Sequence, residues 1–67
     1  MKAVSGKELC RILERLGWVR VKTKGGHRKY VKPGYSPVVI PVHGNKSLKS
    51  GTQHKIMRDA GLTEADL

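Results

Sequence analysis

The chain has 67 residues, and its 14 Lys and Arg outnumber 5 Asp and Glu, which gives a formal net charge of +9. A chain of this length has room for one small domain, which we expect to occupy residues 1–67. A charge this positive favours a polyanionic partner, either nucleic acid or an anionic membrane surface.

The distribution of acids and cysteine excludes several kinds of site. No carboxylate lies between Arg15 and Arg58, so the basic middle of the chain cannot supply paired acids for glycoside hydrolysis or for magnesium-dependent phosphodiester cleavage. Cys10 is the only cysteine, which excludes an intramolecular disulfide and a zinc site made of cysteines. No apolar run approaches the ~20 residues of a membrane span, and the first residues lack a signal-peptide core, so we expect a cytoplasmic protein. No predicted helix has a strongly cationic face opposite a broad apolar one, which disfavours binding to a membrane surface.

A helix is predicted directly after Ser5. Ser5 and Glu8 have the spacing of a capping box, in which each side chain accepts a hydrogen bond from the other residue's amide. Four apolar residues then recur at helical spacing and form one stripe: Leu9, Ile12, Leu13 and Leu16. Gly17 supplies the left-handed residue that ends the helix, and Cys10 is expected to be a half-buried structural thiol.

Two strands joined by a glycine turn are predicted next. From Trp18 to Thr23, valines at positions 19 and 21 alternate with Arg20 and Lys22, which indicates a half-buried strand with a basic outer face. Gly25-Gly26 makes the turn. The second strand runs from residue 27 to 32, with aromatic packing in the core from Trp18 and from the tyrosine at position 30.

The face of the second strand follows from its alternation. If Tyr30 points to the core, His27 and Lys29 lie on the opposite, exposed face. Pro33-Gly34 then predicts a type II turn, because proline presets the first central position and glycine accepts the positive φ of the second. The stretch from residue 37 to 43 is the third strand, and Pro41 places it at an edge of the sheet or ends it there, since proline has no amide hydrogen to donate.

A polar loop from residue 43 to 46 leads to a second helix, which begins near Ser50 and stops at Gly61. A last short turn is expected from Thr63 to Asp66. The predicted fold is therefore α+β, in the order α-β-β-β-α, with a three-stranded antiparallel sheet and both helices packed on one face of it.

Three histidines are the only side chains that titrate near neutral pH without help: His27, His43 and His54. By residue type alone, His27 is either a catalytic base or a surface histidine beside a turn. His43 either meets a phosphate or bonds to loop backbone, and His54 is expected to be solvated. The histidine spacing does not suit zinc, so we predict no metal site and no cofactor.

Basic residues around these histidines are the expected contacts for a polyanion. Gly51-Thr52, at the start of the second helix, presents free amides that bind either an anion or water. With His43, the predicted RNA-binding residues are Lys22, Lys24, Arg28, Lys29, Lys46 and Lys49.

These motifs resemble those of the HicA-type toxins of bacterial HicA/HicB toxin–antitoxin systems. The matching pieces span nearly the whole chain in order: Ser5-Gly6-Lys7-Glu8, Leu16-Gly17-Trp18, Gly26-His27-Arg28-Lys29-Tyr30, Pro41-Val42-His43-Gly44-Asn45-Lys46, Gly51-Thr52 and Ala60-Gly61-Leu62. The resemblance implies a double-stranded-RNA-binding-like fold, cleavage of messenger RNA (mRNA), and a HicB-type antitoxin that covers the catalytic face. It also implies that His27 is catalytic, because it occupies the histidine of the family's Gly-Ser-His motif. Gly26 stands where serine is usual, and Tyr30 where phenylalanine is common.

The sequence and the resemblance together predict a metal-independent endoribonuclease. His27 would take the proton of a ribose 2′-hydroxyl, whose oxygen attacks the adjacent phosphorus, while nearby Lys and Arg stabilise the developing charge. His43 is the first candidate for the second proton transfer. The alternative is a noncatalytic RNA-binding module that uses the same basic face.

Overall fold

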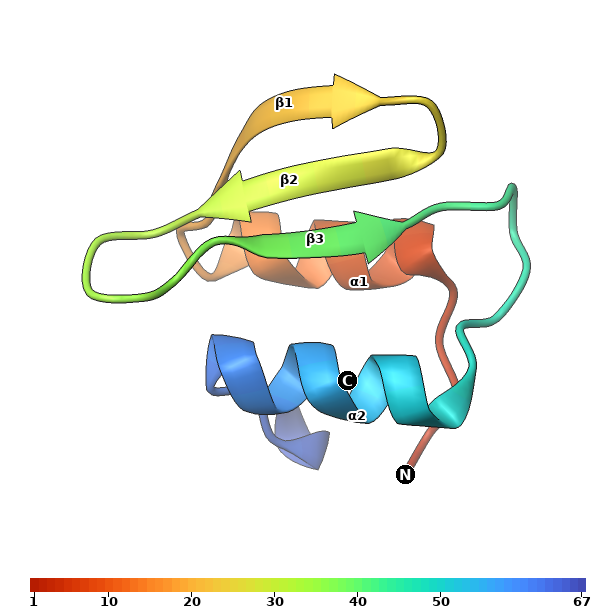
Figure 1. Cartoon of the computed structure of the whole chain (residues 1–67). Coiled ribbons are helices and arrows are strands. Elements are labelled where there is room, and N and C mark those ends of the chain that lie inside the picture. The colour runs from red at the N-terminus through yellow and green to blue at the C-terminus, as the bar shows by residue number, and fades with distance from the viewer.

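The protein is described by a computed structural model that covers residues 1–67. In chain order its elements are α1 (Gly6–Arg15), β1 (Val19–Lys24), β2 (His27–Val31), β3 (Val38–Pro41), α2 (Ser50–Ala60) and a short 3-10 helix, η1 (Glu64–Asp66). The strands form one antiparallel sheet in the order β1-β2-β3, and both helices lie on the same side of it (Figure 1). The α+β class and the α-β-β-β-α order are confirmed. None of the helices is long and apolar enough to cross a membrane.

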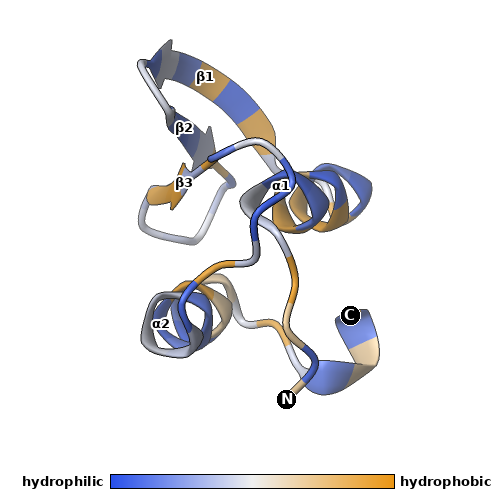
Figure 2. Ribbon diagram, turned by 90° about the vertical axis from the view of Figure 1, so that its right-hand side faces the viewer, coloured by the Kyte–Doolittle hydropathy of each residue, from blue (hydrophilic) through white to orange (hydrophobic).

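Helix α1 begins with the capping box that the sequence predicts. The amide of Glu8 donates to Ser5 Oγ at 3.1 Å, and the amide of Ser5 donates to Glu8 Oε1 at 3.2 Å. Hydrophilic residues cover the side of α1 that faces away from the sheet (Figure 2). Leu16, expected in the apolar stripe, is instead 39% exposed, because the helix ends at Arg15 and Leu16 is its cap. Cys10 is fully rather than half buried.

Strand β1 differs from the sequence prediction. Its residues are all exposed, and the two valines expected in the core, Val19 and Val21, are 59% and 53% exposed. A β-bulge between Arg20 and Lys22 breaks the period of two, so Arg20 pairs with Tyr30 while Lys22 pairs with Lys29. The predicted basic outer face therefore loses Arg20 and keeps Lys22. Neither helix shields this edge strand from solvent.

Tyr30 anchors the core beneath the sheet. Tyr30 is fully buried, and Trp18 is 3% exposed, which confirms packing roles for both. The Tyr30 hydroxyl donates to Glu14 Oε2 at 2.6 Å. Burial, and then this hydrogen bond, raise the pKa of Tyr30 above its ordinary range. The other buried apolar side chains of the core are Val4, Leu9, Cys10, Ile12, Leu13, Val38, Ile40, Ile56 and Ala60.

The type II turn, the end of the third strand and the end of the second helix agree with the sequence predictions. The amide of Tyr35 donates to the Lys32 carbonyl at 3.1 Å, and Gly34 has φ +87°, as a type II turn requires. Strand β3 lies at an edge and ends at Pro41. Helix α2 ends at Ala60 and is capped by Gly61, whose φ is +70°.

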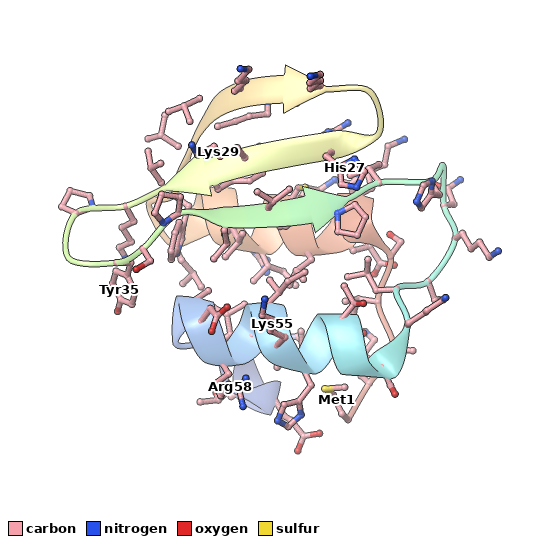
Figure 3. All side chains as sticks on the ribbon, viewed as in Figure 1. Met1, His27, Lys29, Tyr35, Lys55 and Arg58 are labelled. Atoms are coloured by element: carbon pink, nitrogen blue, oxygen red, sulfur yellow. The ribbon has the colours of Figure 1, made fainter.

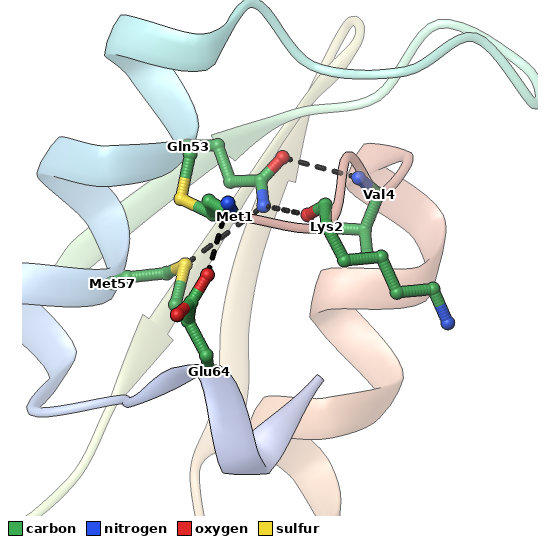
Figure 4. Close-up of polar contacts among 6 residues, drawn as sticks. All are labelled: Met1, Lys2, Val4, Gln53, Met57 and Glu64. Atoms are coloured by element: carbon green, nitrogen blue, oxygen red, sulfur yellow. Dashed lines mark hydrogen bonds and ion pairs between the residues drawn. The ribbon is translucent and has the colours of Figure 1, made fainter.

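A buried glutamine joins the N-terminal segment to α2. Gln53 Nε2 donates to the Lys2 carbonyl at 2.6 Å, and Gln53 Oε1 accepts from the Val4 amide at 3.1 Å (Figure 4). The Val4 carbonyl in turn accepts from the Leu48 amide at 2.9 Å. Residues 2–4 therefore connect α2 to the loop that precedes it.

Candidate nucleic-acid interface

His27 is the first residue of β2, where the central strand leaves the glycine turn. It lies opposite Lys24 on β1 and opposite Pro41 on β3. Directly opposed residues in an antiparallel sheet point to the same face. Since Tyr30, three residues on, points into the core, this row of three lies on the face turned away from the helices. The predicted exposure of His27 is confirmed.

A second row of the same face follows two residues along β2. Lys29 lies opposite Lys22 on one side and opposite Val39 on the other. We call the face formed by both rows the outer face; its residues are Lys22, Lys24, His27, Lys29, Val39 and Pro41. Figure 3 shows His27 and Lys29 on β2.

The lysines of the outer face have no anionic partner within the chain. The only ion pair in the structure joins the Met1 α-amino group to Glu64 at 3.0 Å. Like charges placed directly opposite each other, as Lys22 and Lys29 are, destabilise a sheet. A bound polyanion would remove that repulsion, so the outer face has the electrostatics of an anion-binding surface.

Arg28 does not share this face with His27. It lies opposite Thr23 and Ile40, is half buried, and belongs to the side of the sheet that carries Tyr30. Adjacent residues of a strand point to opposite faces, so proximity to His27 in the sequence does not bring the two side chains together. The cation opposite His27 is instead Lys24.

His43 lies beside the glycine turn. The Val42 amide donates to the Gly26 carbonyl at 2.6 Å, which continues the β2–β3 pairing past the end of β3. A Cβ placed on Gly26 would be 3.7 Å from His43 Cε1 and 3.9 Å from His43 Nδ1, so the imidazole of His43 lies against the residue that precedes His27. The structure thus places His43 at the glycine-turn end of the sheet, beside the residue that precedes His27. His54 lies elsewhere, in a hollow with Met57 and Thr63.

A surface hollow of about 440 Å³ adjoins His43, and we call it the loop hollow. It is lined by Pro41, His43, Lys46, Ser47, Leu48, Lys49 and Thr52. Lys46 and Lys49, which the sequence singles out, therefore lie near His43 but not on the outer face. Helix α2 begins here, with no acid in its first turn and no side chain capping its amides.

The start of α1 contacts both ends of the segment between β3 and α2, which carries these residues. Gly6, at the start of α1, packs so closely on the Pro41 carbonyl that a Cβ there would overlap it. Ser5 forms an isolated β-bridge with Ser47. Gln53 accepts a hydrogen bond from the Val4 amide and so fixes the residue before Ser5, a role that the sequence did not predict. Its spacing could have revealed it, because position 53 precedes the buried Ile56 at helical intervals.

No group of three or more His, Cys, Asp or Glu side chains is placed to hold a metal ion.

Comparison with known proteins identifies a family. The family model described as the HicA toxin of bacterial toxin–antitoxin systems matches residues 6–62, which is most of the 67-residue chain. The matched segment contains α1, the whole sheet and α2. Comparison with curated proteins gives no match.

Proposed function

The chain belongs to the HicA toxin family of bacterial toxin–antitoxin systems, and we propose that it is a metal-independent endoribonuclease that cleaves mRNA with His27 as its catalytic base. The observation that carries this proposal is the placement of His27 on the outer face, opposite Lys24 and next to the lysine pair of the second row. An imidazole exposed among uncompensated cations suits a phosphodiester substrate, which brings its own negative charge.

In the proposed reaction, neutral His27 accepts the proton of a ribose 2′-hydroxyl. The 2′-oxygen attacks the adjacent phosphorus, and the products are a 2′,3′-cyclic phosphate and a 5′-hydroxyl. Acid–base assistance of this kind contributes about 10²- to 10⁴-fold. Lys24 and Lys29 supply positive charge toward the phosphorane, whose charge rises as the transition state forms.

RNA binding is proposed to extend from the outer face to the loop hollow. Lys22, Lys24 and Lys29 would contact phosphates over the sheet, and Lys46 and Lys49 would do so at the hollow. Arg28 remains a predicted contact that would have to reach RNA around the sheet from the side of the helices.

Membership of a toxin–antitoxin family implies an antitoxin partner. We propose a HicB-type protein that covers the outer face. A formal net charge of +9 favours an acidic surface on that partner, because complementary charge speeds association and selects among partners.

One observation favours the alternative of a noncatalytic RNA-binding module. No side-chain hydrogen bond in the structure involves His27, so no hydrogen bond within the chain orients its imidazole, although catalytic hydrogen bonds often form only with substrate present. In that alternative His27 is one polar contact among the lysines.

Incubation of purified protein with single-stranded RNA in EDTA separates the two functions. Cleavage that leaves cyclic-phosphate ends, and that disappears in His27→Ala but persists in the matched control His54→Ala, supports the endoribonuclease. Intact RNA with shifted mobility supports the binding module. Cleavage by His27→Ala at the native rate would remove His27 from the catalytic role.

A further inference from the structure

His27 is the first residue of β2, and His43 follows shortly after the end of the neighbouring strand β3. His27 pairs with Pro41, and the pairing continues through the bond between Val42 and Gly26. His43 follows two residues beyond Pro41, just past the end of β3, so it lies at the His27 end of the sheet. Diagonal neighbours in an antiparallel sheet lie roughly 7–8 Å apart, and at such a separation two side chains can contact one phosphate from two sides.

The contact with Gly26 places the His43 ring independently of this register argument. Atoms of the imidazole would lie within 4 Å of a Cβ at position 26. The absence of that Cβ leaves the ring close to the backbone just before His27. The ring is thus at the glycine-turn end of the sheet, on the side of His27 that borders the loop hollow.

The segment that carries His43 is fixed on both sides. The Val42 amide is bonded to Gly26 before it, and the Lys46 amide donates to the His43 carbonyl at 3.0 Å after it. The bridge between Ser5 and Ser47 ties the end of the same loop to the start of α1. A catalytic side chain requires this kind of support, because small misplacements are costly.

We propose that His43 is the general acid that protonates the leaving 5′-oxygen, and that the loop hollow receives the next phosphate on the 3′ side of the cut. This inference rests on the proposed function, which already assigns the base to His27. In an in-line displacement the attacking and leaving oxygens lie on opposite sides of the phosphorus, so base and acid must flank it. His27 flanks the phosphate on the side of the sheet lysines, and His43 on the side of the hollow.

The step is balanced in atoms and protons. The bond from the 2′-oxygen to phosphorus forms as the bond from phosphorus to the 5′-oxygen breaks. The 2′-hydroxyl proton passes to His27, and the proton of His43 passes to the 5′-oxygen. The RNA strand that leaves then has its first phosphate beside Lys46 and Lys49, which line the hollow with His43.

A sulfur leaving group tests the assignment of His43, because a thiolate leaves without protonation. An RNA oligonucleotide cut at one mapped position is compared with the same oligonucleotide carrying sulfur in place of the bridging 5′-oxygen there. We expect His43→Ala to lose about 10²- to 10⁴-fold on the oxygen substrate and to recover close to the native rate on the sulfur substrate. His27→Ala should be impaired on both substrates, and His54→Ala should cleave both at the native rate.

Three results would overturn the assignment: native-rate cleavage of the oxygen substrate by His43→Ala, an equal loss on both substrates, or sulfur rescue of His27→Ala in place of His43→Ala. Failure of the proposed function is distinguishable, because the native protein would then leave both substrates intact, or His27→Ala would cleave both at the native rate. Recovery on sulfur also shows that His43→Ala is folded.

Shortened substrates test the hollow. One oligonucleotide ends in a 3′-hydroxyl one nucleotide beyond the cut, and its partner carries a 3′-phosphate there. We expect the native protein and the control Lys7→Ala to prefer the phosphate-bearing substrate, and a Lys46→Ala, Lys49→Ala double variant to lose that preference. If the double variant keeps the preference for the 3′-phosphate substrate, or if the native protein lacks it, then the loop hollow does not bind the downstream phosphate.

Discussion

Lys22 of β1 lies directly opposite Lys29 of β2 on the outer face. The β-bulge after Arg20 creates this pair, because it turns Lys22 away from the helices. The fold therefore carries a repulsive cross-strand contact at the place where the proposed RNA backbone would pass. Stability and binding make opposite demands on this pair.

Lys22→Ala should stabilise the fold and weaken RNA binding at the same time. Loss of the repulsion should raise the free energy of unfolding by about 0.2–1 kcal/mol. Loss of one phosphate contact should reduce the salt slope of single-strand binding by about 0.7. Urea denaturation measures the first, and titrations of RNA at several salt concentrations in a His27→Ala background measure the second. Unchanged affinity and slope would remove Lys22 from the interface.

Gly6→Ala should destabilise the protein although alanine is the better helix former. Its Cβ would overlap the Pro41 carbonyl, and forcing an added group into a packed site costs about 1–3 kcal/mol. Gly51→Ala is the matched control, because a Cβ there meets nothing within 4 Å and alanine gains up to about 1 kcal/mol from helix propensity. Thermal unfolding of the two variants should shift in opposite directions. Equal shifts would contradict the close approach of α1 to β3.

Gln53→Ala should loosen the N-terminal segment. It removes the acceptor of the Val4 amide and the donor to the Lys2 carbonyl, and each buried polar group left unpaired costs about 1–3 kcal/mol. Hydrogen exchange should then accelerate at the Val4 amide and at the Leu48 amide, which bonds to the Val4 carbonyl. Exchange that is fast at Val4 alone would show that the loop is held without this segment.

Tyr30→Phe should change how stability depends on pH. The pKa of Tyr30 is raised in the folded state, so its contribution to stability is complete below the unfolded value of about 10 and is lost as pH rises toward the folded value. At neutral pH the variant loses its bond to Glu14, at a cost of about 1–2 kcal/mol. Urea midpoints from pH 7 to 11 should converge for the two proteins as pH rises. A constant gap would show that Tyr30 does not ionise on unfolding.

Features that depend on neighbouring residues can be predicted from the amino-acid order. The capping box of Ser5, the Pro33-Gly34 turn and the end of β3 at Pro41 each follow from chemistry within about four residues. The exposure of His27 follows from strand alternation once Tyr30 is assigned to the core. The order of elements, and with it the fold class, could be predicted for the same reason.

Features that depend on the register between segments distant in the chain become visible only in the folded molecule. The bulge in β1 sets Lys22 opposite Lys29, and no local pattern announces where an extra residue enters a ladder. Val19 is exposed because it lies opposite Val31, which faces away from the core as a neighbour of the buried Tyr30. Gln53 is buried because it bonds to residues about fifty positions away. His43 reaches the His27 end of the sheet because β3 pairs with β2, and that pairing joins residues that the sequence separates.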